Sequence, residues 1–174
     1  MPKPYKVVVT GPFNAGKTTF VNTLCHCDTV TTDKATRRPV EARVKPTTTV
    51  ALDYGQVKLR RNLTIHLFGT PGQQRFDFMR DLLADGMHGF IFLIDSTDHR
   101  SLKPASELLT LFRQRSNVPY LLVANKADQP GLSPAEIRAQ VRLAEEQPII
   151  TCIATDERSV RAVVERLVGM MEGR

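Results

Sequence analysis

The chain has 174 residues, 24 of them Lys or Arg and 18 Asp or Glu, which gives a formal net charge of +6. Its hydrophobic share of 41% and charged share of 24% are ordinary for a globular protein, so a wholly disordered chain is excluded. A length close to the roughly 150 residues of a typical domain predicts one domain over residues 1–174. No apolar run approaches the ~20 residues that a membrane-spanning helix needs.

The two ends and the cysteines predict a cytoplasmic protein. The start MPKPYK is not followed by an apolar signal stretch, Pro2 excludes N-myristoylation, and the end MEGR is not a prenylation box. Three cysteines are an odd number and do not form a disulfide framework. We therefore expect no integral membrane segment and no lipid anchor.

The positive charge is concentrated in the first third of the chain. Residues 1–61 carry a net +7 and residues 62–174 a net −1. A basic segment of this kind is compatible with nucleic acid, with an anionic membrane surface or with bound phosphate, and composition does not choose among them.

Apolar, β-branched runs alternate with helical patterns along the chain. Strands are predicted at residues 5–10, 47–58, 62–68, 90–95, 118–124 and 148–153, and helices at 17–24, 75–85, 100–115, after 133 and at 158–171. Residues 133–136 form a capping box with Pro at the first helical position. Residues 28–46 are polar and basic, and we expect a loop there. Continuous apolar strands separated by helices predict an α/β fold, a mostly parallel sheet with helices on both faces and one antiparallel edge around residues 60–62.

A phosphate-binding pattern follows the first predicted strand. Residues 11–18 read GPFNAGKT, which is GxxxxGK[ST] between a strand and a helix. Backbone N–H groups and the helix N-terminus face the anion, Lys17 reaches the β- and γ-phosphates, and the Thr18 hydroxyl is a ligand for Mg²⁺. The predicted nucleotide contacts come from Gly11, Asn14, Ala15, Gly16, Lys17, Thr18 and Thr19. The motif predicts a nucleoside triphosphate, but not its base.

The base is predicted from the segment Asn125-Lys126-Ala127-Asp128. It follows the strand at 118–124, and ligands bind beyond the carboxyl ends of parallel strands. The Asp128 carboxylate can accept from both N1–H and the exocyclic amine of guanine, a donor pair that adenine lacks. We expect Asn125 to brace the loops, Lys126 to lie along the base and the Ala154 N–H to donate to the guanine oxygen.

Two further segments have the chemistry of switch loops. In residues 69–73, GTPGQ, the Gly72 N–H can sense a γ-phosphate and Gln73 can orient an attacking water. In residues 47–49, a Thr can bind Mg²⁺ by its hydroxyl and the γ-phosphate by its N–H, which orders the loop only with triphosphate bound. Chemistry alone leaves open which Thr does this.

Taken in order, these motifs resemble the five guanine-nucleotide motifs of the Ras-like small GTPases. The resemblance covers nearly the whole chain and implies a P-loop NTPase G domain with a six-stranded sheet. Residues 73–95 look like the second switch helix and following strand of Rab and Arf types. The strings GPFNAGKTTF, TTTVALDYG and HLFGTPGQQRF resemble prokaryotic small GTPases of the gliding-motility and Roadblock-associated kind. A Thr-x-x-x-Asp-aromatic pattern marks the magnesium Thr in those proteins, and here it falls on Thr49, with Asp53 and Tyr54.

Three positions depart from the family pattern. Gly69 stands where most members have an Asp that helps to hold Mg²⁺, and we hypothesise that Asp53 replaces it. Phe13 stands where many members have a small residue, which would restrict an incoming arginine finger. Thr48 stands where gliding-motility enzymes have Arg, so no intrinsic finger is predicted there.

The resemblance implies a GTP-binding switch that hydrolyses GTP slowly with Mg²⁺ until a partner stimulates it. The implied catalytic residues are Gln73, Lys17 and Gly72, and the implied metal-site residues are Thr18, Thr49 and Asp53. The implied partners are an activating protein and effectors, and a Roadblock-domain protein is one candidate. No nucleic-acid partner is expected, and membrane contact is expected only through partners. Two alternatives stay open: a P-loop ATPase or small-molecule kinase, and a pseudo-GTPase interaction module, which Gly69 favours.

Overall fold

The computed structural model describes residues 3–25, 53–71 and 83–173. Six strands in this part of the chain form one sheet in the order β2-β3-β1-β4-β5-β6. The strands are β1 (Lys3–Thr10), β2 (Asp53–Arg60), β3 (Leu63–Gly69), β4 (Gly89–Asp95), β5 (Tyr120–Asn125) and β6 (Ile149–Thr151). The helices are α1 (Lys17–Cys25), the short 3₁₀ helix η3 (His99–Ser101), α3 (Leu102–Arg115), α4 (Pro134–Val141) and α5 (Glu157–Met171).

The strand directions confirm the predicted sheet. β1 pairs in parallel with β3 and β4, β4 with β5, and β5 with β6, whereas β2 runs antiparallel to β3 at the edge. Since β1, β3, β4 and β5 are parallel, their carboxyl ends lie at the same end of the sheet. The loops that follow them carry the predicted nucleotide motifs.

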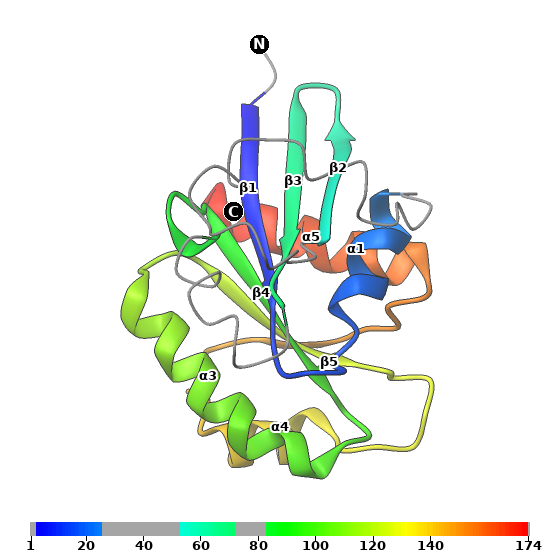
Figure 1. Cartoon of the computed structure of the whole chain (residues 1–174), viewed down its shortest axis with the longest axis vertical. Coiled ribbons are helices and arrows are strands. Elements are labelled where there is room, and N and C mark those ends of the chain that lie inside the picture. The colour runs from blue at the N-terminus through cyan, green and yellow to red at the C-terminus, as the bar shows by residue number, and fades with distance from the viewer. Residues whose placement is uncertain (1–2, 26–52, 72–82, 174) are drawn as a thin grey trace, which may run out of the picture.

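Helices cover both faces of the sheet (Figure 1). On one face, α1 and α5 pack on the sheet through residues such as Phe20 and Leu167, both fully buried. On the other face, α3 and α4 contribute Phe112 and Ile137 to a second core. All seven residues of β4 are buried, as expected for a central strand with a helix layer on either side. No helix among the described residues has the length and apolar composition that crossing a membrane requires.

Most element boundaries differ from the predicted ones by one or two residues. The predicted capping box at 133–136 is confirmed: the Ser133 side chain accepts from the Glu136 N–H, and the Glu136 carboxylate accepts from the Ser133 N–H. The predicted strand at 47–58 is confirmed from residue 53 onward, and it continues to Arg60. The predicted loop at 28–46 and most of the predicted helix at 75–85 lie outside the described residues.

Candidate nucleotide-binding site

The phosphate loop has the backbone conformation that its glycines make possible. Gly11 has φ +143°, Asn14 +64° and Gly16 +97°, which are angles that residues with a side chain adopt rarely. A Cβ at Gly11 would lie 2.1 Å from the backbone oxygen of Leu93, and a Cβ at Gly16 would lie 2.3 Å from Asn125 Nδ2. Both positions therefore require glycine, and the loop turns tightly from the end of β1 into α1.

Lys17 lies under this loop at the first residue of α1. Its side chain is buried, and Nζ donates hydrogen bonds to the backbone oxygens of Gly11 at 3.0 Å and Pro12 at 2.6 Å. The ammonium is thus held at the helix N-terminus, where backbone N–H groups also favour an anion. Thr18 and Thr19 follow on the exposed side of the helix. This is the arrangement predicted for a phosphate cradle.

Asn125 joins the phosphate loop to two other segments. It ends β5, its side chain is 2% exposed, and Nδ2 donates to the Ala15 oxygen at 2.9 Å. Its Oδ1 accepts from the Ala154 N–H at 2.9 Å. The predicted bracing role of Asn125 is therefore visible as two buried hydrogen bonds.

The Ala154 N–H, for which the sequence predicts a contact with the guanine oxygen, donates to the Asn125 carboxamide in this structure. A donation to guanine would have to share or replace this hydrogen bond. The physical reason for this hydrogen bond is that a buried amide side chain needs partners for both of its ends, and the Ala154 N–H lies within reach of Oδ1.

The base-reading loop continues with Lys126 and Asp128. Lys126 has φ +62°, and its Nζ lies 2.5 Å from Asp95 Oδ2. The Ala127 N–H donates to the Cys152 oxygen at 3.1 Å, which ties the loop to the end of β6. Asp128 is exposed beside these contacts, so its carboxylate is open to a ligand.

Asp95 belongs to this site although the sequence analysis did not single it out. It ends β4, is 4% exposed, and accepts at Oδ1 from the Thr97 N–H at 2.9 Å and the Thr97 hydroxyl at 2.6 Å. Burial acts to raise the pKa of Asp95, but the hydrogen bonds from Lys126 and Thr97 and the Lys126 charge outweigh it and lower the pKa. The sequence signal that could have identified Asp95 is a carboxylate at the end of a buried strand. This strand, β4, lies between β1 and β5, which both lead into nucleotide motifs.

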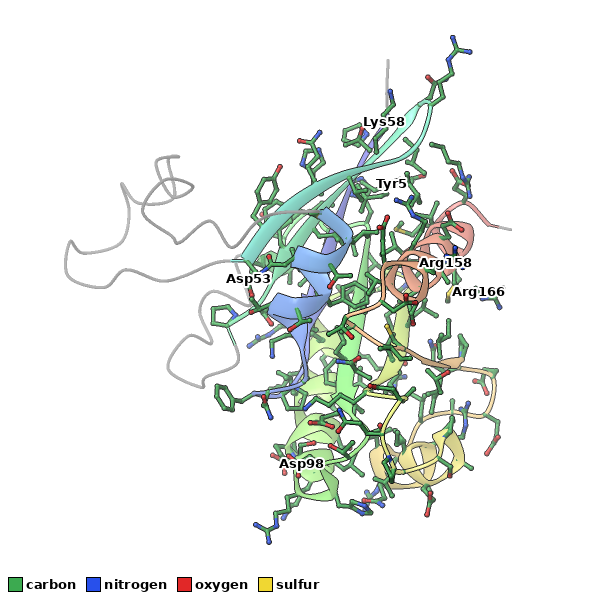
Figure 2. The ribbon with its side chains drawn as sticks, turned by 90° about the vertical axis from the view of Figure 1, so that its right-hand side faces the viewer. Tyr5, Asp53, Lys58, Asp98, Arg158 and Arg166 are labelled. Carbon is green, nitrogen blue, oxygen red and sulfur yellow. The ribbon has the colours of Figure 1, made fainter. Side chains whose placement is uncertain are left out.

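Thr18 and Asp53, two of the predicted metal-site residues, are in contact. The Thr18 hydroxyl donates to Asp53 Oδ2 at 2.5 Å, and Figure 2 shows Asp53 at the start of β2, beside α1. Asp53 is the antiparallel partner of Gly69 on β3. A Cβ at Gly69 would lie 2.9 Å from the Asp53 Cβ and 3.1 Å from its Oδ2, so the Asp53 side chain occupies the space next to position 69.

Three predicted site residues, Thr49, Gly72 and Gln73, lie outside the described residues, and their roles stay predictions. Phe13 lies on the phosphate loop with 70% of its surface exposed. Among the described residues, the structure therefore brings together the phosphate loop, the base-reading loop, Ala154 and Asp53 at one end of the sheet.

Comparisons with known proteins agree with this architecture. Residues 1–171 match the model of the ADP-ribosylation factor family. An uncharacterized protein of Methanocaldococcus jannaschii is 32% identical over 132 residues, which cover 76% of either chain. Human ADP-ribosylation factor-related protein 1 is 32% identical over 127 residues, which cover 71% of this chain and 60% of that protein. The chain thus spans about three fifths of that relative's length.

A solved structure has the same fold. The Arl6 BBS3 small GTPase of Trypanosoma brucei, determined with the nucleotide analogue GppNp, superposes with a TM-score of 0.76 over 98% of this chain and 99% of that one. At 20% sequence identity this likeness concerns the fold. The match to the family model covers nearly the whole sequence, and the chain belongs to the ADP-ribosylation factor family of small GTPases.

Proposed function

We propose that this protein is a GTP-binding molecular switch that hydrolyses GTP to GDP and phosphate. The observation that carries this proposal is the link through Asn125, whose two hydrogen bonds hold the phosphate loop next to the base-reading loop. A phosphate cradle and a carboxylate suited to guanine therefore lie at the same end of the sheet. The family's fold with GppNp bound, in the Trypanosoma brucei protein, supports the same reading.

The residues of the phosphate loop supply most of the electrostatic stabilisation. Lys17 is held where its charge can reach the β- and γ-phosphates, and the loop N–H groups face the same anion. Gly72 binds the γ-phosphate through its N–H, and Gln73 orients the water that attacks the γ-phosphorus. Without an arginine finger, turnover of this type is on the order of 10⁻⁴ s⁻¹, so an activating protein is part of the proposal.

Magnesium is the proposed metal, held by Thr18, Thr49 and Asp53. The donor set fits, because Mg²⁺ takes oxygen ligands and the Thr18 hydroxyl and the Asp53 carboxylate are in contact. When bound, the ion supplies neutralisation of charge on the phosphate oxygens. Asp53 takes over the part that an Asp at position 69 plays in most Ras-like proteins.

One experiment tests the proposed function against both alternatives. Labelled GTP and ATP are titrated against the purified protein, and phosphate release is measured with excess Mg²⁺. We expect binding of GTP and GDP, no competition by ATP, and slow release of phosphate from GTP. A preference for ATP would favour the ATPase or kinase, and GTP binding without any phosphate release would favour a pseudo-GTPase.

The type of small GTPase, its partner and its location are proposed from sequence resemblance. We propose that the chain is a single G domain closest in kind to the gliding-motility and Roadblock-associated GTPases, that its partner is a Roadblock-domain protein and that it lies in the cytoplasm, reaching membranes through partners. To test the partner, we would measure whether a Roadblock-domain protein co-purifies with this chain. The proposal expects co-purification with GTP bound and not with GDP bound. A chain that pellets with membranes without any partner would contradict the localisation.

A further inference from the structure

A buried carboxylate lies directly behind the base-reading loop. Asp95 is the last residue of β4 and pairs in register with Asn125, the last residue of β5. Its Oδ1 is fixed by two hydrogen bonds from Thr97, at 2.6 and 2.9 Å, and its Oδ2 accepts from Lys126 Nζ at 2.5 Å. A carboxylate that is 4% exposed and has both oxygens occupied has a fixed orientation.

The same short segment also holds the backbone of the base-reading loop. The Ser96 N–H and hydroxyl both donate to the Asn125 oxygen, at 3.1 and 2.8 Å. Lys126, the next residue, has φ +62°, a conformation that directs its side chain toward β4. Residues 95–97 therefore fix both the backbone that precedes Lys126 and the ammonium at the end of its side chain.

We propose that Asp95 is a positioning residue for guanine nucleotides, acting through Lys126. By holding the ammonium, it keeps the methylene chain of Lys126 extended at the site where the base binds, so that the chain offers apolar surface to the flat ring. A lysine already held in its binding conformation loses less rotational freedom when the ligand arrives, which raises the affinity, and affinity differences at one site appear mostly in the release rate. This inference rests on the proposed function, since the ligand that Lys126 contacts is a guanine nucleotide.

The competing explanation is that Asp95 only stabilises the loop backbone through its hydrogen bonds from Thr97, independently of Lys126. In that case, loss of the Asp95 charge would affect the protein to the same extent whatever residue stands at position 126. If Asp95 acts through Lys126, its loss has an effect only while the lysine is present. A double-mutant cycle separates the two explanations.

The experiment measures the release rate of fluorescently labelled GDP from wild type, Asp95→Asn, Lys126→Met and the double variant. We expect Asp95→Asn to speed release about tenfold, as for loss of a hydrogen-bonded charge pair, and to add less than about twofold when Lys126 is already Met. Thr97→Ala, which removes one hydrogen bond to Asp95 and no charge, should speed release about threefold. This milder variant keeps the test decisive if Asp95→Asn does not fold.

Asp98→Asn is the matched control. Asp98 lies three residues further along (Figure 2), where its carboxylate caps η3 by accepting from the Arg100 N–H at 3.0 Å. The Asp98→Asn variant should release labelled GDP at the wild-type rate. Equal effects of Asp95→Asn in both Lys126 backgrounds, or no effect of Asp95→Asn and Thr97→Ala, would overturn this proposal alone. A wild type that binds no guanine nucleotide would overturn the proposed function.

Discussion

Asp53 and Gly69 face each other across β2 and β3, and the absence of a side chain at Gly69 leaves room for the Asp53 carboxylate. That carboxylate contacts the hydroxyl of Thr18, the residue that follows the phosphate-loop lysine. We propose that the neighbouring strand supplies, through Asp53, the acidic group that most Ras-like proteins carry at position 69. The two positions are therefore coupled, because a side chain at position 69 would collide with the Asp53 side chain.

We expect Asp53→Ala to weaken the retention of GDP and GTP about tenfold with Mg²⁺ at millimolar concentration, because an oxygen next to the proposed metal ligand Thr18 is lost. With the metal chelated, wild type and variant should release nucleotide at the same rate. Asp85→Ala, an exposed acidic residue just before β4, is the control. An unchanged Mg²⁺ dependence would remove Asp53 from the metal site. The exchange Asp53→Gly with Gly69→Asp should recover most of the loss.

Asp128→Asn should change the base preference from guanine to xanthine. The carboxylate accepts two donors of guanine, and the loss of two charge-assisted hydrogen bonds lowers GTP affinity at least about a hundredfold. Xanthine presents an oxygen in place of the amine, and the Asn amide can donate to it. Competition of GTP and XTP for the labelled site measures the change. A variant that still prefers GTP would place base selection elsewhere.

Asn125→Ala should destabilise the protein even without nucleotide. The substitution leaves the Ala154 N–H and the Ala15 oxygen without their partner, at a cost of about 2–3 kcal/mol in the free energy of unfolding. Urea unfolding followed by circular dichroism measures it. Asn125→Asp keeps the acceptor for Ala154 but places a buried carboxylate oxygen against the Ala15 oxygen, so it should destabilise the protein at least as much as Asn125→Ala. Identical unfolding midpoints for all three proteins would show that the two hydrogen bonds contribute little.

Gln73→Leu should slow GTP hydrolysis about tenfold or more, since leucine cannot orient the attacking water. The affinity for GTP should stay within about twofold, because the side chain acts on the water rather than on the nucleotide. Single-turnover phosphate release measures the rate. Equal rates in both proteins would exclude Gln73 from the mechanism.

The acid stability of the protein should depend partly on Asp95. Its pKa in the folded protein is lowered, so its contribution to stability is complete above the unfolded-state pKa of about 4 and is lost as the pH falls through the lowered value. The difference in urea midpoint between wild type and Asp95→Asn should therefore be large at pH 7 and shrink toward pH 3. A difference that does not change with pH would mean that the Asp95 charge adds nothing to stability.

The fold could be predicted from the sequence because its signals are local. β4 is one continuous apolar run, and the helix after residue 133 begins at a capping box that four adjacent residues specify. The phosphate loop is local for the same reason, since Gly11, Gly16 and Lys17 lie within seven residues of chain. The conformation of such segments is determined by residues that are adjacent in the sequence.

Contacts between distant residues were harder to predict. Lys126 and Asp95 are 31 residues apart, and Ala154 and Asn125 are 29 apart, so each pairing depends on how neighbouring strands end. Sequence spacing does not fix such ends to within one residue. For the same reason the Ala154 N–H is not evident from the sequence as the partner of Asn125 Oδ1, whereas a bracing role for Asn125 follows from the loop motif.

The two hydrogen bonds of Asn125 have a consequence for nucleotide exchange. They connect the predicted phosphate loop to the segment around Ala154, so displacement of one strains the other. We therefore expect a partner that displaces either end of the nucleotide to loosen both ends. Release would then be one cooperative event with a single rate, even for a protein that touches only the phosphate side.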